Sequence, residues 1–342
     1  MHNDQTMKFM YATDENFVHV TATSMYSLMK QHVQRAMRVH IVLDQDVTHE
    51  SRALLQKIGK KFGKEIVLID MPDFASLTNT ALDIKRYSLS MFSRLMVGTL
   101  LPREAQRVIY LDADTLICDD LYPLWMMNLG EKVVGAVNDF RSKAYSHNLG
   151  IKQTNCYINS GILLIDLEKY RARRCEERLL GALGKLNGLL EFPDNDLICK
   201  VLQDEIALLP VQYNMTSALR MCGYRQLLWL RHPAFRITEK MFEQANQRPA
   251  ILHFTTFFLM KRRPWIEGCD HPDAQRYVQL RMEATGTPPE KMTQKSGARQ
   301  RLINAVMYGM PRPALIFIAG ILHAYIKPWK QGLRMKKCRE QM

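Results

Sequence analysis

Short apolar segments that alternate with amphipathic, helix-length segments fill the first 70 residues of the chain. The runs "MKFMYATD", "RVHIVLDQD" and "EIVLID" are typical of strands, and residues 16–32 and 48–62 carry apolar side chains at helical spacing. Strands separated by helices in this way form a mostly parallel sheet covered on both faces. The sequence therefore predicts an α/β fold. Ligands of such sheets bind beyond the carboxyl ends of the strands, where "ATD" lies.

The α/β pattern continues through most of the remaining sequence. We expect further strands in "VIYL", "VVGAVND", "INSGILLID" and "PAILHFT", and helices over about 83–99 and about 167–186. The segment "EFPDNDLICKVL" begins another helix, for which Asp194 is placed as the N-cap.

Composition excludes several classes of protein. The 342 residues are 47% hydrophobic and 24% charged, which is typical of a globular chain. Seven scattered cysteines without a CxxC pair argue against a disulfide scaffold or a structural zinc site. The N-terminal residues have no basic region followed by an apolar one, so no signal peptide is expected. These features predict a cytoplasmic protein.

The net charge of +13 is concentrated at one end. Residues 291–342 contain eleven Lys or Arg and one acid, Glu340, and so hold ten of the thirteen net charges. The preceding residues are close to neutral, and we expect no nucleic-acid surface.

Sequence composition divides the chain into a main domain, 1–285, and a basic segment, 286–342. The segment contains an apolar run, Pro313–Ile326, of about 14 residues, whereas a membrane-spanning helix needs about 20. Basic residues and Trp329 flank the run, as in segments that lie on an anionic membrane surface. The alternative is a helix that packs on the main domain.

The stretch "VIYLDADTLICDDL", residues 108–121, ends an apolar strand with two carboxylates one residue apart. On a continuing strand Asp112 and Asp114 would point to opposite faces, but where the strand ends and turns, both can reach one ion. Two carboxylates suit Mg²⁺ or Mn²⁺. Such an ion can hold a diphosphate and neutralise its charge as it leaves.

Two families contain a motif of this kind. The haloacid dehalogenase phosphatases have a hydrophobic-DxDxT motif that fits "VIYLDADT", with Asp112 as nucleophile and Asp114 as acid and base. That family carries the motif near its N-terminus and needs a later acidic pair for Mg²⁺. Asp119 and Asp120 follow too soon to serve as that pair.

Several separate stretches together resemble the bacterial glycosyltransferases of family 8, over about residues 7–275. They are "MYATDENFV", "YSLSMFSRL", "VIYLDADTLICDDL", "VND", "YINSGILLIDLEKY", "FPDNDLI", "LLPVQYN", with the expected strand over 209–214, and "ILHFT". Their order and spacing carry the resemblance, which implies a Rossmann-like nucleotide-sugar-binding domain of the GT-A type.

The resemblance also implies roles for individual residues. Asp112, Asp114 and His253 would hold Mn²⁺, with Mg²⁺ as an alternative, because a set that includes a nitrogen suits Mn²⁺ better. Asp194 and Asn195 would lie nearest the reacting carbon. The expected donor-binding residues are Ala12, Asp14, Asn16, Phe17, Arg94, Asp112, Ala113, Asp139, Asn159, Lys261 and Arg263.

The chain departs from the family pattern at two places. Asn195 stands where the family usually has Gln, and its shorter side chain alters the reach of the amide. The loop after His253, "HFTTFFLMKRRPW", is longer than usual and lacks a glycine. It offers Lys261, Arg262 or Arg263 to the leaving phosphate, and Arg263 has the position that the family's Lys-Pro-Trp sequence gives to its lysine. An arginine there can hold phosphate through two parallel hydrogen bonds.

The resemblance implies a retaining, metal-dependent transfer of galactose or glucose from a UDP-sugar. The acceptor is expected to be a lipid-anchored glycan such as lipopolysaccharide core, met at the inner face of the cell membrane through the basic tail. Two alternatives stay open at this point. One is the phosphatase, and the other is a non-catalytic homologue that binds nucleotide sugar without turnover.

Overall fold

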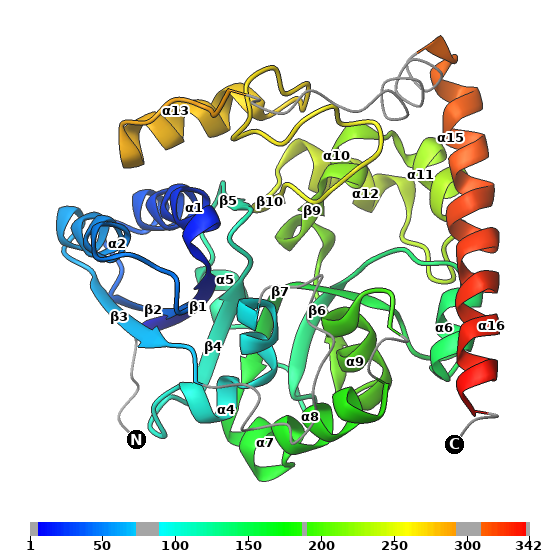
Figure 1. Ribbon diagram of the computed structural model, residues 1–342, viewed down its shortest axis with the longest axis horizontal. Coiled ribbons are helices and arrows are strands. Elements are labelled where there is room, and N and C mark those ends of the chain that lie inside the picture. The colour runs from blue at the N-terminus through cyan, green and yellow to red at the C-terminus, as the bar shows by residue number, and fades with distance from the viewer. Residues whose placement is uncertain (1–5, 73–88, 187–189, 292–308, 340–342) are drawn as a thin grey trace.

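A computed structural model of the protein describes residues 6–72, 89–186, 190–291 and 309–339. A seven-stranded sheet forms its centre, with helices on both faces, and a three-stranded sheet lies beside it (Figure 1). The large sheet has the order β3-β2-β1-β4-β7-β6-β8. Its strands are β1 (Met7–Thr13), β2 (Met37–Leu43), β3 (Glu65–Asp70), β4 (Arg107–Leu111), β6 (Val134–Asn138), β7 (Ile158–Asp166) and β8 (Ile206–Leu208).

Neighbouring strands of the large sheet are parallel, except that β7 is antiparallel to both β4 and β6. The predicted mostly parallel sheet is therefore confirmed. In the small sheet β10 (Ile251–His253) runs antiparallel to β5 (Thr115–Ile117) and parallel to β9 (Met215–Thr216). The small sheet thus brings β10 against the segment that follows β4.

Successive residues of the central strands pack into separate hydrophobic cores on the two faces. In β1, Phe9 and Tyr11 belong to one core, and Met10 and Ala12 belong to the other. Side chains of adjacent strand residues point to opposite faces, and all seven residues of β1 are buried. This double burial explains why the strands read as nearly continuous apolar runs.

The helices cover the two faces and one edge of the large sheet (Figure 1). In chain order they are η1 (Glu15–Phe17), α1 (Val18–Gln31), α2 (His49–Lys61), η2 (Leu89–Leu95), α4 (Val97–Leu100), α5 (Tyr122–Trp125), α6 (Lys143–Leu149), α7 (Leu167–Ala172), α8 (Cys175–Leu186), α9 (Pro193–Val201), η3 (Val211–Tyr213), α10 (Ser217–Met221), α11 (Tyr224–Arg231), α12 (Glu239–Gln247), α13 (Ala274–Thr285), α15 (Arg312–Ile321), the π-helical η4 (Leu322–Ile326) and α16 (Lys327–Arg339).

Two predicted helices are broken in the structure. The first half of the helix expected over 83–99 lies outside the described residues, and the rest forms the 3-10 helix η2 followed by the short α4. The helix expected over 167–186 is divided into α7 and α8 at Arg174, whose φ of 52° is left-handed. A residue in that conformation cannot continue a right-handed helix.

The predicted N-cap of α9 and the predicted strand over 209–214 are both wrong. Phe192 is the N-cap of α9, Pro193 takes the first helical position, and Asp194 lies in the first turn. Proline is common at the first helical position, because an N–H group there would have no acceptor within the helix. Residues 209–214 form the turn around η3 between β8 and β9 rather than a strand.

The C-terminal helices α15, η4 and α16 form one continuous rod along an edge of the molecule (Figure 1). The rod continues through Pro328, which has no N–H to donate to the carbonyl of Ala324. Ser142 Oγ donates to that carbonyl instead, at 2.8 Å, and Asn148 Nδ2 donates to the Pro328 carbonyl at 2.6 Å. These bonds attach the rod to the region of α6.

Close packing on α11 also holds the rod. Ile316 is fully buried, and a Cβ added to Gly320 would lie 2.2 Å from the carbonyl oxygen of Trp229. Of the helices described, none combines the length and apolarity that crossing a bilayer requires.

Candidate active site

The turn after β4 directs two carboxylates to the same side. The Asp112 N–H still pairs with the Gly161 carbonyl of β7, at 2.8 Å. The chain then turns, and Thr115 Oγ1 donates to the Asp112 carbonyl at 2.7 Å before β5 begins. The Asp114 carbonyl accepts a hydrogen bond of 2.9 Å from the Phe254 N–H, next to His253. Backbone pairing on both sides of the turn therefore sets the positions of Asp112 and Asp114.

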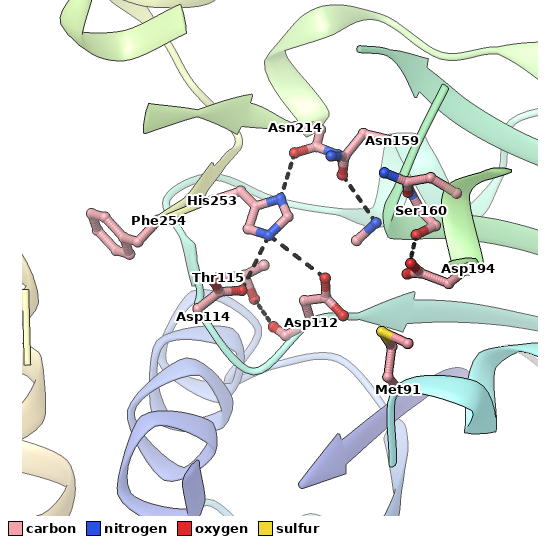
Figure 2. A network of polar contacts seen from close by, with 12 residues as sticks. Met91, Asp112, Asp114, Thr115, Asn159, Ser160, Asp194, Asn214, His253 and Phe254 are labelled. Atoms are coloured by element: carbon pink, nitrogen blue, oxygen red, sulfur yellow. Dashed lines mark hydrogen bonds and ion pairs between the residues drawn. The ribbon is translucent and has the colours of Figure 1, made fainter. Parts of the chain in front are cut away.

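His253, the last residue of β10, brings its imidazole to these two carboxylates. Its Nε2 lies 3.1 Å from Asp114 Oδ1 and 3.6 Å from Asp112 Oδ2 (Figure 2). One potential ligand atom from each of the three residues lies within 4.8 Å of the others. Two ligands at right angles around a cation lie about 3 Å apart when each is about 2.1 Å from it, and both His253 contacts are near that separation. The donor set fits a divalent ion.

A chain of two asparagines determines which nitrogen of His253 faces the carboxylates. Asn214 Nδ2 donates to Asn159 Oδ1 at 2.8 Å, which leaves Asn214 Oδ1 to accept from His253 Nδ1 at 2.9 Å (Figure 2). Asn159 Oδ1 also accepts the Gly161 N–H at 3.0 Å. Burial opposes a charge on the ring, but Asp114 and Asp112 outweigh it and raise the pKa of His253, which favours a proton on Nε2 directed at Asp114. A metal bound at Nε2 would replace that proton while Nδ1–H stays bonded to Asn214.

Arg94 joins the metal-ligand cluster to the residues at the start of α9. Its buried guanidinium lies 2.7 Å from Asp112 Oδ1 and 2.8 Å from Asp194 Oδ2. Burial opposes the charged form, but Asp112 and further neighbours outweigh burial and raise the pKa of Arg94. Arg94 therefore holds Asp112 and Asp194 on either side of one cation.

The first turn of α9 is also attached to β7. Asp194 Oδ2 accepts from Ser160 Oγ at 2.6 Å, and Asn195 Oδ1 accepts the Ser160 N–H at 2.7 Å. Asp196 is fully buried and accepts the backbone N–H groups of Glu191 and Phe192, at 3.0 and 3.1 Å. Asp194 and Asn195 thus have set positions beside the carboxylate cluster.

Arg263 comes to the same cluster from the loop after β10. Its Nη1 lies 2.7 Å from Asp114 Oδ2, and its Nη2 donates to Thr256 Oγ1 at 2.7 Å. Lys261, the other basic residue predicted for this role, is exposed. Its backbone N–H donates to Asp270 Oδ1 at 2.8 Å.

The two carboxyls respond differently to their surroundings. Burial raises the pKa of Asp112 although Arg94 and His253 oppose the shift. Burial acts in the same direction on Asp114, but His253 and Arg263 outweigh it, so the pKa of Asp114 is lowered. Each carboxylate also raises the cost of ionising the other. A cation bound between them would relieve this repulsion.

A cavity of about 200 Å³ opens beside the carboxylates. It is lined by these residues that the sequence assigned to the donor or metal: Ala12, Asp14, Phe17, Arg94, Asp112, Ala113, Asp114 and Arg263. Phe17 is 37% exposed and packs edge-on against Trp265, with ring centroids 5.8 Å apart. The ends of β1 and β4 therefore contribute to one cavity, as expected for a parallel sheet.

Other predicted residues lie apart from this cavity. Asn16 is exposed, and Asn159 takes part in the asparagine chain that orients His253. Asp139 is 6% exposed and its carboxylate forms an ion pair of 2.5 Å with Arg141.

The sequence reasoning missed three residues at the site. Asn214 orients His253, Ser160 holds Asp194 and Asn195, and Gly161 leaves room for His253 and Asp112. All three lie in stretches that carried the resemblance, "LLPVQYN" and "YINSGILLIDLEKY". Their position within those stretches was the signal that could have identified them, because none of them has an ionisable side chain that would suggest a role at the site.

Comparison with known families decides the class of this site. The profile of the family described as "Glycosyl transferase family 8" matches residues 8–267, most of the chain. The chain belongs to glycosyl transferase family 8. The resemblance inferred from the sequence is confirmed, and the family assignment leaves the phosphatase alternative without support.

Relatives within the family are distant in sequence. General stress protein A of Bacillus subtilis (strain 168) is 24% identical over 282 residues, 81% of this chain and 93% of that protein. The lipopolysaccharide glucosyltransferase WaaO of Escherichia coli (strain K12) is 22% identical over 293 residues, 83% of this chain and 78% of that protein.

Solved structures identify the fold. The galactosyltransferase LgtC, in complex with donor and acceptor sugar analogs, superposes with a TM-score of 0.67 over 82% of this chain and 98% of that chain, at 23% identity. The family 8 chain therefore has the GT-A glycosyltransferase fold, with the Asp-Asp-His cluster at its candidate metal site.

Proposed function

We propose that this chain is a retaining glycosyltransferase that moves galactose or glucose from a UDP-sugar to a hydroxyl group of lipopolysaccharide core or a similar surface glycan. The observation that carries the proposal is the convergence of Asp112, Asp114 and His253 beside a cavity at the ends of β1 and β4. Family membership supports the glycosyltransferase class, and relatives such as WaaO support the acceptor class.

The three converging residues would hold Mn²⁺, or Mg²⁺, through two oxygens and one nitrogen. When bound, such an ion neutralises the charge of the leaving diphosphate. Arg263 adds a positive group whose two terminal nitrogens suit a phosphate. Arg94 opposes the effect of burial on Asp112 and aligns that carboxylate, because it approaches it at 2.7 Å from a buried position.

The other wall of the site serves the sugar in this proposal. Asp194 is held by Arg94 and Ser160, and Asn195 is held by the Ser160 backbone, so both project from α9 in set orientations. We assign Asp194 and Asn195 to the neighbourhood of the reacting carbon. Asn159 contacts the donor sugar or acts by positioning His253. Asp139 contacts the donor sugar or acts by positioning Arg141.

A donor screen tests the proposal. Purified protein with Mn²⁺ is incubated with UDP-galactose, UDP-glucose and their N-acetylated analogues, and released UDP is measured. We expect slow UDP release from one of the first two donors, abolished by EDTA and restored by Mn²⁺. Stabilisation by UDP and Mn²⁺ without release from any donor, even with a lipopolysaccharide-core acceptor, would instead support a binding protein without turnover.

We further propose that the C-terminal rod places the enzyme on the anionic inner face of the cell membrane. The support is a face of exposed large apolar side chains, at helical spacing along the rod: Phe317, Ile318, Ile321, Leu322, Tyr325, Ile326, Trp329 and Leu333. Exposed Lys330 and Arg334 lie on the same rod. Apolar area together with cationic charge favours an anionic bilayer as the partner.

Single substitutions on the rod test membrane contact without removing its buried contacts. Phe317→Asp and Trp329→Asp are each expected to weaken binding to vesicles containing anionic lipid by about tenfold or more, from the lost burial of one large apolar side chain. Met241→Asp, at a residue 52% exposed on α12, is the matched control. Co-sedimentation measures binding, and equal losses in all three variants would contradict the assignment.

A further inference from the structure

A second cavity, of about 240 Å³, lies between the loop after β10, α11 and the C-terminal rod. Thr256 and Phe258 come from the loop, Arg231 from α11, and His323 and Lys327 from the rod. Aromatic walls with a few polar groups are typical of ligand sites.

Positive charge is in excess around this cavity. Arg141, Arg231 and Lys327 line it, and no carboxylate is among its described lining residues. The charge of Arg141 is balanced by Asp139, at 2.5 Å. Within the described part of the chain, neither Arg231 nor Lys327 forms a side-chain hydrogen bond or an ion pair. Asp139 also attracts Arg231 but is paired with Arg141, so positive charge around the cavity exceeds the negative charge beside it.

The environment of Arg231 is unfavourable for its own charge. Burial, and next the neighbouring Arg141, lowers the pKa of Arg231 to about 10. Buried charges are normally paired, because an unpaired one loses its hydration without compensation. An anion that enters the cavity would therefore stabilise the charged guanidinium of Arg231.

His323 adds a neutral polar group to the same cavity. Burial, together with Lys327 and Arg231, lowers the pKa of His323 to about 4, so the ring is uncharged at neutral pH. The ring stacks on Phe258, with centroids 6.2 Å apart and an angle of 26° between the planes. His323 belongs to η4, and π-helical turns are frequent at functional sites.

The cavity adjoins the candidate active site. Thr256, which lines it, accepts the hydrogen bond from Arg263 Nη2, and Arg263 Nη1 contacts Asp114. Arg141, which also lines the cavity, holds the carboxylate of Asp139, which is proposed to act at the donor sugar. A molecule whose hydroxyl approaches the donor sugar can therefore extend into this cavity.

We infer that this cavity binds a phosphate group on the acceptor glycan, through Arg231 and Lys327. The inference rests on the proposed glycosyltransferase function. Two unpaired cations match the charge of about −1.5 to −2 that a phosphate monoester carries at pH 7. The guanidinium of Arg231 offers paired donors to phosphate oxygens, and Lys327 adds a point charge at the mouth.

Direct binding of inorganic phosphate tests the cavity without donor or metal. Isothermal titration in EDTA compares wild type with Arg231→Gln and Lys327→Gln. We expect saturable binding that is at least about tenfold weaker in each variant, from the loss of a charge-assisted contact. Arg225→Gln, at an exposed arginine on the same helix, is the matched control and is expected to bind as wild type. Lys327 is itself exposed, so its variant is not at risk of misfolding.

The outcomes distinguish a failure of this inference from a failure of the proposed function. They also distinguish a phosphate on the acceptor glycan from the phosphate of a lipid headgroup. Phosphate binding that does not weaken in Arg231→Gln and Lys327→Gln would overturn the inference, whatever the donor screen shows. Binding at the donor-site arginines is common to all these proteins, so it cannot produce the expected difference. If Arg231→Gln instead loses binding to phosphatidylglycerol vesicles while Arg225→Gln retains it, the cavity serves a lipid headgroup and the acceptor assignment is wrong.

Discussion

Replacement of Asp114 by asparagine is expected to lower donor-dependent UDP release by about 10³-fold or more. The substitution keeps the size of the side chain but removes the charge that lies 3.1 Å from His253 Nε2 and 2.7 Å from Arg263 Nη1. The three-ligand set then loses its most ionised member, since the pKa of Asp114 is lowered by His253 and Arg263 against the effect of burial. UDP release and Mn²⁺ affinity are measured on the same protein.

Asp119→Asn provides the matched control for this prediction. Asp119 lies five residues further along the same acidic motif, but its side chain is 45% exposed and its ion-pair partner is Arg248, at 3.2 Å. We expect Asp119→Asn to retain UDP release and Mn²⁺ affinity within about twofold of wild type, because exposed pairs contribute little. Thermal melting of both variants separates lost chemistry from lost fold. Full activity in Asp114→Asn would contradict the assignment of Asp114 to the metal.

The sheet was largely predictable from the sequence because both of its faces are buried. Residues of β1 fill two cores in alternation, and that arrangement leaves continuous apolar runs that only a covered, mostly parallel sheet explains. Helix boundaries were less predictable. The break at Arg174 depends on a left-handed backbone conformation for which an arginine gives no local signal.

The metal-ligand cluster was predictable only in part. Asp112 and Asp114 are separated by one residue in the sequence, and a strand end that turns brings them together. His253 reaches them through pairing between β10 and β5, a contact over more than one hundred residues for which the local sequence holds no information. The family resemblance supplied that contact. The ion pair between Arg94 and Asp194 likewise depends on how η2 and α9 pack, and neither propensity nor spacing encodes it.

The C-terminal rod illustrates a different limit. Charge and apolarity predicted a segment that meets a membrane, with packing on the domain as the alternative. The structure places buried Ile316 and Gly320 against α11 while large apolar side chains remain exposed on the same helix. Packing and an exposed apolar face therefore occur together. From the sequence, packing on the domain and contact with a membrane looked like alternatives. One helix can combine them, because it can bury one face and expose another.

Replacement of Gly161 by alanine is expected to weaken Mn²⁺ binding strongly by steric displacement of the ligands. A Cβ at this position would lie 2.2 Å from His253 Cε1 and 2.7 Å from Asp112 Oδ2. Gly161 is not among the glycines with positive φ, so the requirement is for space rather than for backbone conformation. Both ligands must move, and we expect Mn²⁺ affinity to fall about 100-fold or more, beyond the loss typical of residues that only orient ligands.

The free energy of unfolding shows which residue the added methyl group clashes with. Overpacking of this kind lowers the free energy of unfolding by about 1–3 kcal/mol. The control is Gly181→Ala in α8, where the added Cβ would lie within 4 Å of no described atom beyond its chain neighbours and the backbone of its own helix, and this variant is expected to be neutral or stabilising. If the main clash is with the imidazole, adding Gly161→Ala to His253→Ala should cost less than adding it to wild type. An equal cost in both backgrounds would mean that Gly161 does not make room for His253, because contacting residues are expected to show such coupling.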